Sequence, residues 1–365
     1  MKKNFIALIA LMVVCGADIA VAANTEFNVI DINGQQITLE AGHPSLQHWL
    51  LPAEIPQPEN NKMSAERVAL GEKIFFDPRL SVSGQTSCAS CHAPERGWAD
   101  GFPGSMRLMG ERMARNSPSL VNVAFNSLYA WDGKNPSLED QALGSQSMTG
   151  SLQAGSKEQG ITDANLGVER IRKLAGYQDA FAKAYSGETV SKETIAKAIA
   201  SFERSLVSRD TPFDRWLRGD AAAMTPPQVN GFRVFLDPTK GNCATCHSAP
   251  NFSDNGFHNI GLKQWGEPNA DVGRFKLKAV AAMKGAFRTP PLREVGHSAP
   301  YFHDGSAARL QDVVDHYVRG GDVRSNLSPN LKPLSLTDQE RADLVSFMQA
   351  LSTPYVPYDF PRLPR

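Results

Sequence analysis

Apolar residues recur at helical spacing in three separate stretches of the chain: residues 64–76, residues 192–207 and a stretch that begins after Thr337. The third stretch opens with a capping box, because Glu340 follows Thr337 by three residues. The repeating apolar positions are Val68, Leu70, Ile74 and Phe75; Ile195, Ile199, Phe202 and Leu206; and Leu344, Val345, Phe347, Met348 and Leu351. Residues 97–116, in contrast, are rich in glycine and show no period, which predicts a loop. The pattern therefore predicts a mainly α protein.

The N-terminus has the organisation of a secretory signal peptide. Lys2 and Lys3 precede an apolar run over residues 5–14, and small residues follow at Ala20 and Ala22. The apolar run is too short to span a bilayer, and no later stretch approaches ~20 apolar residues. We therefore expect residues 1–22 to be removed, leaving a periplasmic protein without a membrane span.

Charge and cysteine content narrow the possible functions. The 365 residues include 38 basic and 38 acidic side chains with no basic run, which argues against nucleic acid as a partner. Of the five cysteines, Cys15 leaves with the signal peptide. The other four form the pairs Cys88/Cys91 and Cys243/Cys246, and a histidine follows each pair directly.

Four blocks of sequence occur twice in the same order, which indicates a tandem duplication. The first copy contains Gly71 to Pro78, Cys88 to Pro94, Asn116 to Val123 and Tyr129 to Gly133; the second contains Gly231 to Pro238, Cys243 to Pro250, Arg288 to Val295 and Tyr301 to Gly305. We expect one domain over residues 45–215 and a second over residues 220–352. The proline-rich tail, residues 353–365, is predicted to pack back as an extended strap.

The motif Cys-x-x-Cys-His points to covalently bound haem in each copy. Its two thiols can form thioethers to the haem vinyl groups, and the adjacent imidazole can bind the iron from below, which assigns Cys88, Cys91 and His92 to one haem and Cys243, Cys246 and His247 to the other. A zinc site would need four ligands at short spacing, but the two pairs lie 155 residues apart. A thioredoxin-like redox pair would need a strand before the motif and a helix after it, whereas these pairs follow Ser/Gly-rich and Asn/Gly-rich turns.

The duplication also predicts that the two haems differ. From Asn116 and Arg288 onward the copies keep a constant offset of 172 residues, which pairs Ser145 with Tyr317. If that position faces the iron, Ser145 leaves the first haem open, while a Tyr317 phenolate closes the second and favours its oxidised states. His316 is the rival ligand, but adjacent helical residues point ~100° apart, so only one of the two can face the iron.

With these residues in view, the chain resembles the bacterial dihaem cytochrome c peroxidase and MauG family. The resemblance covers nearly all of the mature chain and includes both haem motifs, Arg115 to Pro118, Trp131 to Gly133, Ser137 to Gly144 and Ala299 to Gly305. It implies two tandem cytochrome c-like domains, each with one covalent haem c, a calcium ion between them, and peroxide chemistry at the N-terminal haem.

Carried over residue by residue, the resemblance implies specific roles. Trp131 matches a tryptophan that relays charge between the haems, and Gln141 matches a glutamine of the distal pocket. Asn116, Ser298 and Pro300 match calcium ligands, the last two through backbone carbonyls. His303 matches a histidine near the second haem that forms hydrogen bonds.

The chain departs from ordinary peroxidases of this family at three places. No histidine lies between His92 and His247, so the histidine that caps the resting first haem is missing near Leu108, although Met106 or Met109 could reach that iron. Those peroxidases have methionine where Tyr317 stands, whereas MauG-like enzymes have tyrosine. The family's distal glutamate is replaced by Ser151, and a Gly/Ser-rich insertion over residues 148–156 shifts the candidate acid to Glu158.

We therefore expect a periplasmic oxidoreductase in which hydrogen peroxide reacts above His92, with Gln141 and Glu158 assisting, and an exported protein partner is oxidised through the second haem. One alternative is a peroxidase that reduces peroxide with electrons from a small cytochrome or copper protein. The other is a non-catalytic electron carrier or redox sensor.

Overall fold

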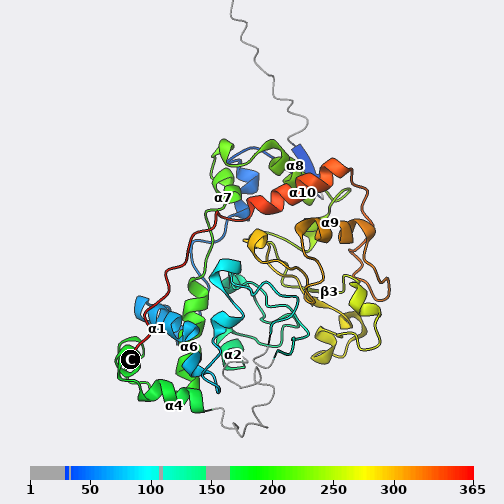
Figure 1. Cartoon of the computed structure of the whole chain (residues 1–365). Helices are drawn as coiled ribbons and strands as arrows, with labels where there is room; N and C mark the ends of the chain where they lie inside the picture. The colour runs from blue at the N-terminus through cyan, green and yellow to red at the C-terminus, as the bar shows by residue number, and fades with distance from the viewer. Residues whose placement is uncertain (1–28, 33, 107–109, 145–164) are drawn as a thin grey trace, which may run out of the picture.

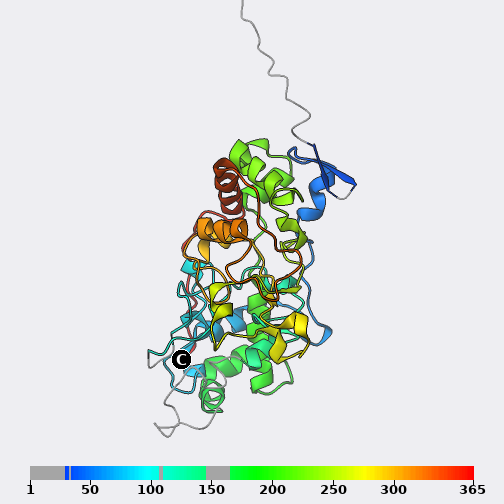
Figure 2. The ribbon, with the colours of Figure 1, turned by 90° about the vertical axis from the view of Figure 1, so that its right-hand side faces the viewer.

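The computed structural model describes residues 29–32, 34–106, 110–144 and 165–365, so the predicted signal peptide, residues 1–22, lies outside the described residues. Two groups of helices occupy opposite ends of an elongated molecule (Figures 1 and 2). Within the described ranges, no helix combines the length and apolarity that a bilayer crossing needs. The chain is rich in helix, as the periodicity predicted.

The first helical group is built around a crossing of two long helices. It contains α1 (Ala65–Phe76), α2 (Leu138–Leu143), α4 (Leu166–Lys173), α5 (Ala175–Ala184) and α6 (Lys192–Ser205). The predicted helices at 64–76 and 192–207 are confirmed as α1 and α6, and Ser64 caps α1 by accepting a hydrogen bond from the Arg67 N–H. Their inner faces bury Ile74, Phe75 and Ile199 in one apolar core.

The second helical group repeats this plan with its own core. It contains α7 (Pro212–Leu217), α8 (Pro226–Leu236), α9 (Leu310–Arg319) and α10 (Asp338–Ala350), with the hairpin of β1 (Val29–Ile32) and β2 (Gln35–Thr38) beside it. The predicted capping box is present, because the Thr337 N–H donates to Glu340 and the Glu340 N–H donates to Thr337 Oγ1. Phe232 and Phe347 pack at 5.0 Å between ring centroids and join α8 to α10.

The N-terminal segment belongs to the second core. Leu46 and Trp49, inside the expected first domain of residues 45–215, are buried there together with Phe213 and Trp216 of α7. The Trp49 ring lies 4.7 Å from that of Phe252 and 5.5 Å from that of Phe232. Residues 30–50 carry too few apolar side chains for a core of their own, so they pack on the aromatic cluster of the second core. The order of the segments along the chain did not predict this packing.

The duplication predicted from sequence is visible in the backbone. The offset of 172 residues relates the bridge between Tyr129 and Asn135 to that between Tyr301 and Ala307. The same offset relates the first residue of α2 to the first residue of α9. It also pairs residues with positive φ: Asn122 with Glu294, Ala130 with Phe302, and Gly133 with Gly305. The two copies therefore share local backbone geometry as well as sequence.

A glycine lies at the helix crossing of each copy. A Cβ atom on Gly71 of α1 would lie 1.9 Å from the carbonyl oxygen of Ala198, and one on Gly231 of α8 would lie 1.9 Å from that of Asp343. Since no side chain fits at that distance, the absence of a Cβ allows α1 to approach α6, and α8 to approach α10, so closely. The matching glycines in the two repeats thus set the same helix crossing twice.

The C-terminal residues run from α10 back to the first helical group (Figure 1). The Arg79 Nη2 donates to the carbonyl oxygen of Pro364 at 2.8 Å, and Tyr358 packs on Phe76 of α1. This path joins the end of the second copy to the core of the first.

Candidate functional site

The two Cys-x-x-Cys-His motifs fold alike. Each starts as one turn of 3-10 helix, residues 88–90 and 243–245. The His92 N–H then donates to the Cys88 carbonyl at 3.0 Å, and the His247 N–H donates to the Cys243 carbonyl at 2.8 Å. All four cysteines are half-buried and none forms a disulfide. Each motif therefore carries two thiols and an imidazole on one short turn, the arrangement that covalent haem attachment needs.

Both motif histidines are oriented by a backbone carbonyl. His92 Nδ1 lies 3.0 Å from the Trp98 oxygen, and His247 Nδ1 lies 2.9 Å from the Phe252 oxygen. A carbonyl only accepts hydrogen bonds, so Nδ1 carries the proton and Nε2 keeps its lone pair for a metal. Burial lowers the pKa of both imidazoles, which favours the neutral form that binds iron.

The residues that supply these carbonyls have an uncommon backbone conformation. Trp98 has φ 61° and Phe252 has φ 55°, values that large side chains rarely adopt. This left-handed turn directs each carbonyl toward its histidine, and its presence in both copies suggests that the strain serves the site. These two residues were not predicted from the sequence, although an aromatic side chain five or six positions after each motif histidine was a usable signal.

A large cavity lies beside the second motif. Its empty space, counted together with its open mouth, is about 1780 Å³. Cys243, Cys246 and His247 form part of its wall. Apolar side chains that also line it are Leu262, Leu292, Val295, Leu310, Val313 and Met348. The cavity thus offers the space, the apolar wall and the attachment groups that fit a haem.

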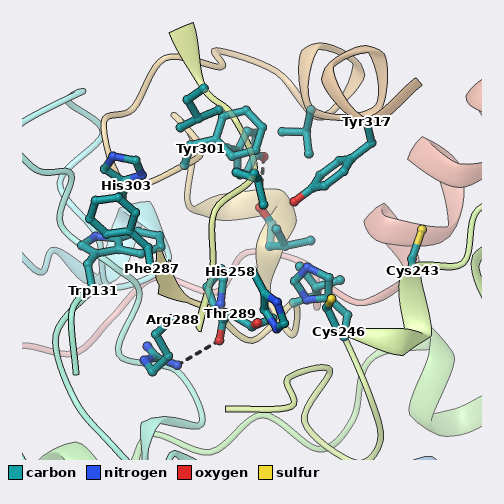
Figure 3. A pocket seen from close by; sticks show the side chains of 18 of the residues that line it. Trp131, Cys243, Cys246, His258, Phe287, Arg288, Thr289, Tyr301, His303 and Tyr317 are labelled. Atoms are coloured by element: carbon teal, nitrogen blue, oxygen red, sulfur yellow. Dashed lines mark hydrogen bonds between the residues drawn. The ribbon is translucent and has the colours of Figure 1, made fainter. Parts of the chain in front are cut away.

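Tyr317 and His316 occupy different environments at the end of α9. The Tyr317 side chain points from α9 into the cavity that Cys246 borders (Figure 3). His316 is buried with Nε2 2.9 Å from the Ile260 oxygen and Nδ1 3.3 Å from Asp322 Oδ2. Burial raises the pKa of Tyr317, so a phenolate there would need a neighbouring cation such as ferric iron.

Trp131 belongs to the first copy but lines the cavity of the second. Its Nε1 donates to the Asn116 carbonyl at 2.8 Å, and its carbonyl accepts from the Arg288 N–H at 2.8 Å. Its ring meets that of His303 edge-on, with 6.3 Å between centroids, and His303 stacks on Phe287 at 3.5 Å (Figure 3). Trp131 is therefore fixed where the two copies meet.

The three expected calcium ligands line one cavity. Asn116, Ser298 and Pro300 all border it, and Asn116 Nδ2 donates to the Phe102 carbonyl at 2.8 Å, which leaves its Oδ1 as an acceptor. Amide and carbonyl oxygens are the hard donors that suit Ca²⁺. These residues fit the expected ion, although they include no carboxylate.

His303, which is expected to form hydrogen bonds near the second haem, lines the cavity. Its carbonyl accepts from the Asn116 N–H at 2.8 Å, but its Nε2 is buried without a hydrogen-bond partner within the described chain. Burial lowers the pKa of His303 to about 4, so the ring is neutral. Its Nε2 is therefore available to a group bound in the cavity.

Among the residues expected on the distal side of the first haem, Gln141 and Met106 lie in the described part of the chain. Gln141 lies half-buried on α2, and α2 ends at Leu143. Ser145, Ser151, Glu158, Leu108 and Met109 lie outside the described residues. Met106, one of the two methionines expected to reach the first iron, is 42% exposed.

Two arginines near Trp131 were assigned no role from the sequence. Arg115 bridges the copies, since it binds Asp132 at 2.7 Å and Asp271 at 2.6 Å. Arg288 is buried, and its Nε has no hydrogen-bond partner in the described ranges. Burial lowers the pKa of Arg288 to about 10. The alignment of Arg288 with Asn116 marked the position, but only the fold shows that the cation is buried at the cavity.

Comparison with known proteins identifies several relatives. Residues 65–222 match the sequence model of the di-haem cytochrome c peroxidase family. The methylamine utilization protein MauG of Methylorubrum extorquens is 37% identical over 97% of this chain and 96% of its own. The cytochrome-c peroxidase IdrP1 of Denitromonas iodatirespirans is 36% identical over 85% of this chain and 88% of its own. A crystal structure of a MauG-like protein associated with microbial copper homeostasis is similar with a TM-score of 0.73 and 32% identity, over 83% of this chain and 95% of that one.

Proposed function

Because the chain belongs to the dihaem cytochrome c peroxidase and MauG family and is a peroxidase-type oxidoreductase, we propose that it uses hydrogen peroxide at its first site to oxidise an exported protein partner through its second. The haems, when bound, would supply the redox chemistry with peroxide. The protein's own residues hold, orient and connect the two sites.

Attachment of the two haems is assigned to the two motifs. Cys88 and Cys91 would form the thioethers of the first haem with His92 as its ligand. Cys243, Cys246 and His247 would do the same for the second. The hydrogen bonds from Nδ1 of His92 and of His247 to backbone carbonyls support this assignment, because they fix each ring with its Nε2 unprotonated.

The position of Tyr317 is the observation that most favours a MauG-like function, in which this residue would bind the second iron. The phenol lines the cavity that contains His247, while His316 has its ring nitrogens bound elsewhere. A phenolate is a hard anionic ligand that stabilises ferric and higher states. The second site is then suited to storing an oxidising equivalent.

Trp131 would relay charge between the sites, since it belongs to one copy and lines the cavity of the other. At the first site, Gln141 would orient peroxide, and Glu158 would move a proton between the two peroxide oxygens. Calcium would bind to Asn116, Ser298 and Pro300, next to Trp131. The signal peptide predicted over residues 1–22 would direct the protein to the periplasm for this reaction.

The substitution Tyr317→Phe tests the proposal. Tyr301→Phe is the matched control, because Tyr301 lines the same cavity but its hydroxyl donates to the Val295 carbonyl at 3.0 Å. We expect Tyr317→Phe to change the ferric spectrum of the second haem and to abolish its stabilised high-valent state after peroxide. A second-haem spectrum unaltered by Tyr317→Phe would exclude the phenolate ligand.

The relatives named cytochrome-c peroxidase favour a second candidate, peroxide reduction with electrons from a small cytochrome or copper protein. That function requires one haem to be reduced before peroxide reacts. Turnover of peroxide with a reduced donor protein, and no reaction of the fully oxidised protein, would support it.

A further inference from the structure

The C-terminal tail places a tyrosine next to the first motif. The Tyr358 ring meets Trp98 edge-on at 5.2 Å and stacks on Phe76 at 5.4 Å. Its hydroxyl donates a hydrogen bond to Glu72 of α1. Phe360 lies 5.5 Å from Tyr358 and is 53% exposed, so this aromatic group reaches the surface.

Trp98 connects that tyrosine with the first motif. Its carbonyl accepts the hydrogen bond from His92 Nδ1, and its indole is buried against Phe75 and Phe202. Indole and phenol are the side chains that lose an electron most readily among the aromatic residues. Two oxidisable rings in contact therefore lead from His92 toward solvent, on the motif side of the first site.

The second copy lacks this arrangement. Phe252 takes the place of Trp98 in orienting His247, and a phenyl ring is far harder to oxidise than an indole. Its neighbour Trp49 is buried in the second core, 2% exposed. The oxidisable path is thus specific to the half whose site is proposed to react with peroxide.

The Tyr358 hydroxyl also has a proton acceptor. Oxidation of a phenol by one electron is favourable only when the phenolic proton can leave, because the radical cation is very acidic. The Glu72 carboxylate already accepts this hydrogen and is itself only half-buried, so it can pass the proton to water.

We propose that Tyr358 is a one-electron oxidation site that drains the first haem site when no protein partner is bound. The Tyr358 O–H bond breaks: its electron passes through Trp98 to an oxidising equivalent held at the first site, and its proton passes to Glu72. The neutral tyrosyl radical then takes one electron and one proton, as a hydrogen atom, from the O–H group of a small phenol at the surface, which leaves as a phenoxyl radical. This inference rests on the proposed function, since peroxide supplies the oxidant.

The test uses the full-length protein with both haems attached. Protein labelled with ring-deuterated tyrosine is mixed with peroxide and frozen, and its electron paramagnetic resonance spectrum is compared with that of unlabelled protein. We expect a tyrosyl signal that narrows on deuteration, and its loss in Tyr358→Phe, which keeps the ring contacts with Trp98 and Phe76. Tyr355→Phe is the matched control, because Tyr355 lies on the same tail and is 55% exposed; it should retain the signal.

Glu72→Gln supplies a second readout. It keeps a hydrogen-bond acceptor for the phenol but takes up no proton, so the tyrosyl signal should form more slowly. A signal of unchanged size in Tyr358→Phe, or no tyrosyl signal in wild-type protein whose haem spectrum does respond to peroxide, would overturn the inference and leave the proposed function standing. A haem spectrum that does not respond to peroxide in any redox state would overturn both.

Discussion

Asp214 of α7 and Arg293 form an ion pair inside the second core, and replacing Asp214 by asparagine should destabilise that core strongly. The two side chains are 1% and 0% exposed, and Arg293 Nη1 lies 2.7 and 2.8 Å from the carboxylate oxygens. Burial lowers the pKa of Arg293, and Asp214 opposes that effect. Without the carboxylate, the cavity wall would keep a buried cation whose other bonds go to backbone carbonyls.

Removing one partner of a buried ion pair costs about 3–5 kcal/mol, which at about 2–4 °C per kcal/mol lowers the melting temperature by on the order of 10 °C. Asp210→Asn is the matched control, because Asp210 pairs with Arg218 at the surface, where the side chains are 72% and 47% exposed. That loss should cost about 0–1 kcal/mol. Urea unfolding followed by circular dichroism measures both variants. Equal urea midpoints for Asp214→Asn and Asp210→Asn would refute the larger cost expected for breaking the buried ion pair.

The remaining predictions concern helix crossing, pH and the relay. Gly231→Ala should lower the free energy of unfolding, measured in urea, by at least about 1–3 kcal/mol, because the new Cβ would meet the Asp343 carbonyl. An unchanged free energy of unfolding would contradict the close approach of α8 to α10. Burial raises the pKa of Glu203 to about 8 from an ordinary value of 4.5, so the folded protein holds a proton that the unfolded chain releases. This contribution to stability is present below about pH 4.5 and is lost as the pH rises toward 8. Glu203→Gln should therefore raise the free energy of unfolding by about 3 kcal/mol at pH 7, measured by thermal unfolding, and should make that free energy less dependent on pH. Trp131→Phe should slow oxidation of the second haem after peroxide in stopped-flow absorbance, because the phenyl ring relays charge poorly; an unchanged rate would remove Trp131 from the path.

The fold was predictable where the relevant pattern is local. Helical spacing located α1, α6 and α10, and the repeated blocks alone predicted two matching copies. The sequence could not show that Leu46 and Trp49 complete the second core, because their partners Phe232 and Phe252 lie some 180 to 200 residues away. That packing depends on which aromatic cluster remains uncovered, a property of the assembled fold.

The residues of the candidate site that belong to a sequence motif or to the internal repeat were predictable. Both motifs and Tyr317 followed from spacing. Helical geometry allowed only one of His316 and Tyr317 to face the cavity, and the repeat offset favoured Tyr317. The distant Ile260 carbonyl holds His316 away from it. The carbonyls of Trp98 and Phe252 depend on left-handed backbone conformations, which leave no mark in hydrophobic periodicity.

Addition of hydrogen peroxide to the fully ferric protein, followed by optical and electron paramagnetic resonance spectroscopy, tests most directly whether an open first site and a tyrosine-ligated second site share oxidising equivalents. The account predicts that both haem signals change without prior reduction and that the oxidised state persists until a reductant is added. A protein that reacts with peroxide only after one haem has been reduced, or whose ferric haems are both six-coordinate with side-chain ligands, would contradict it.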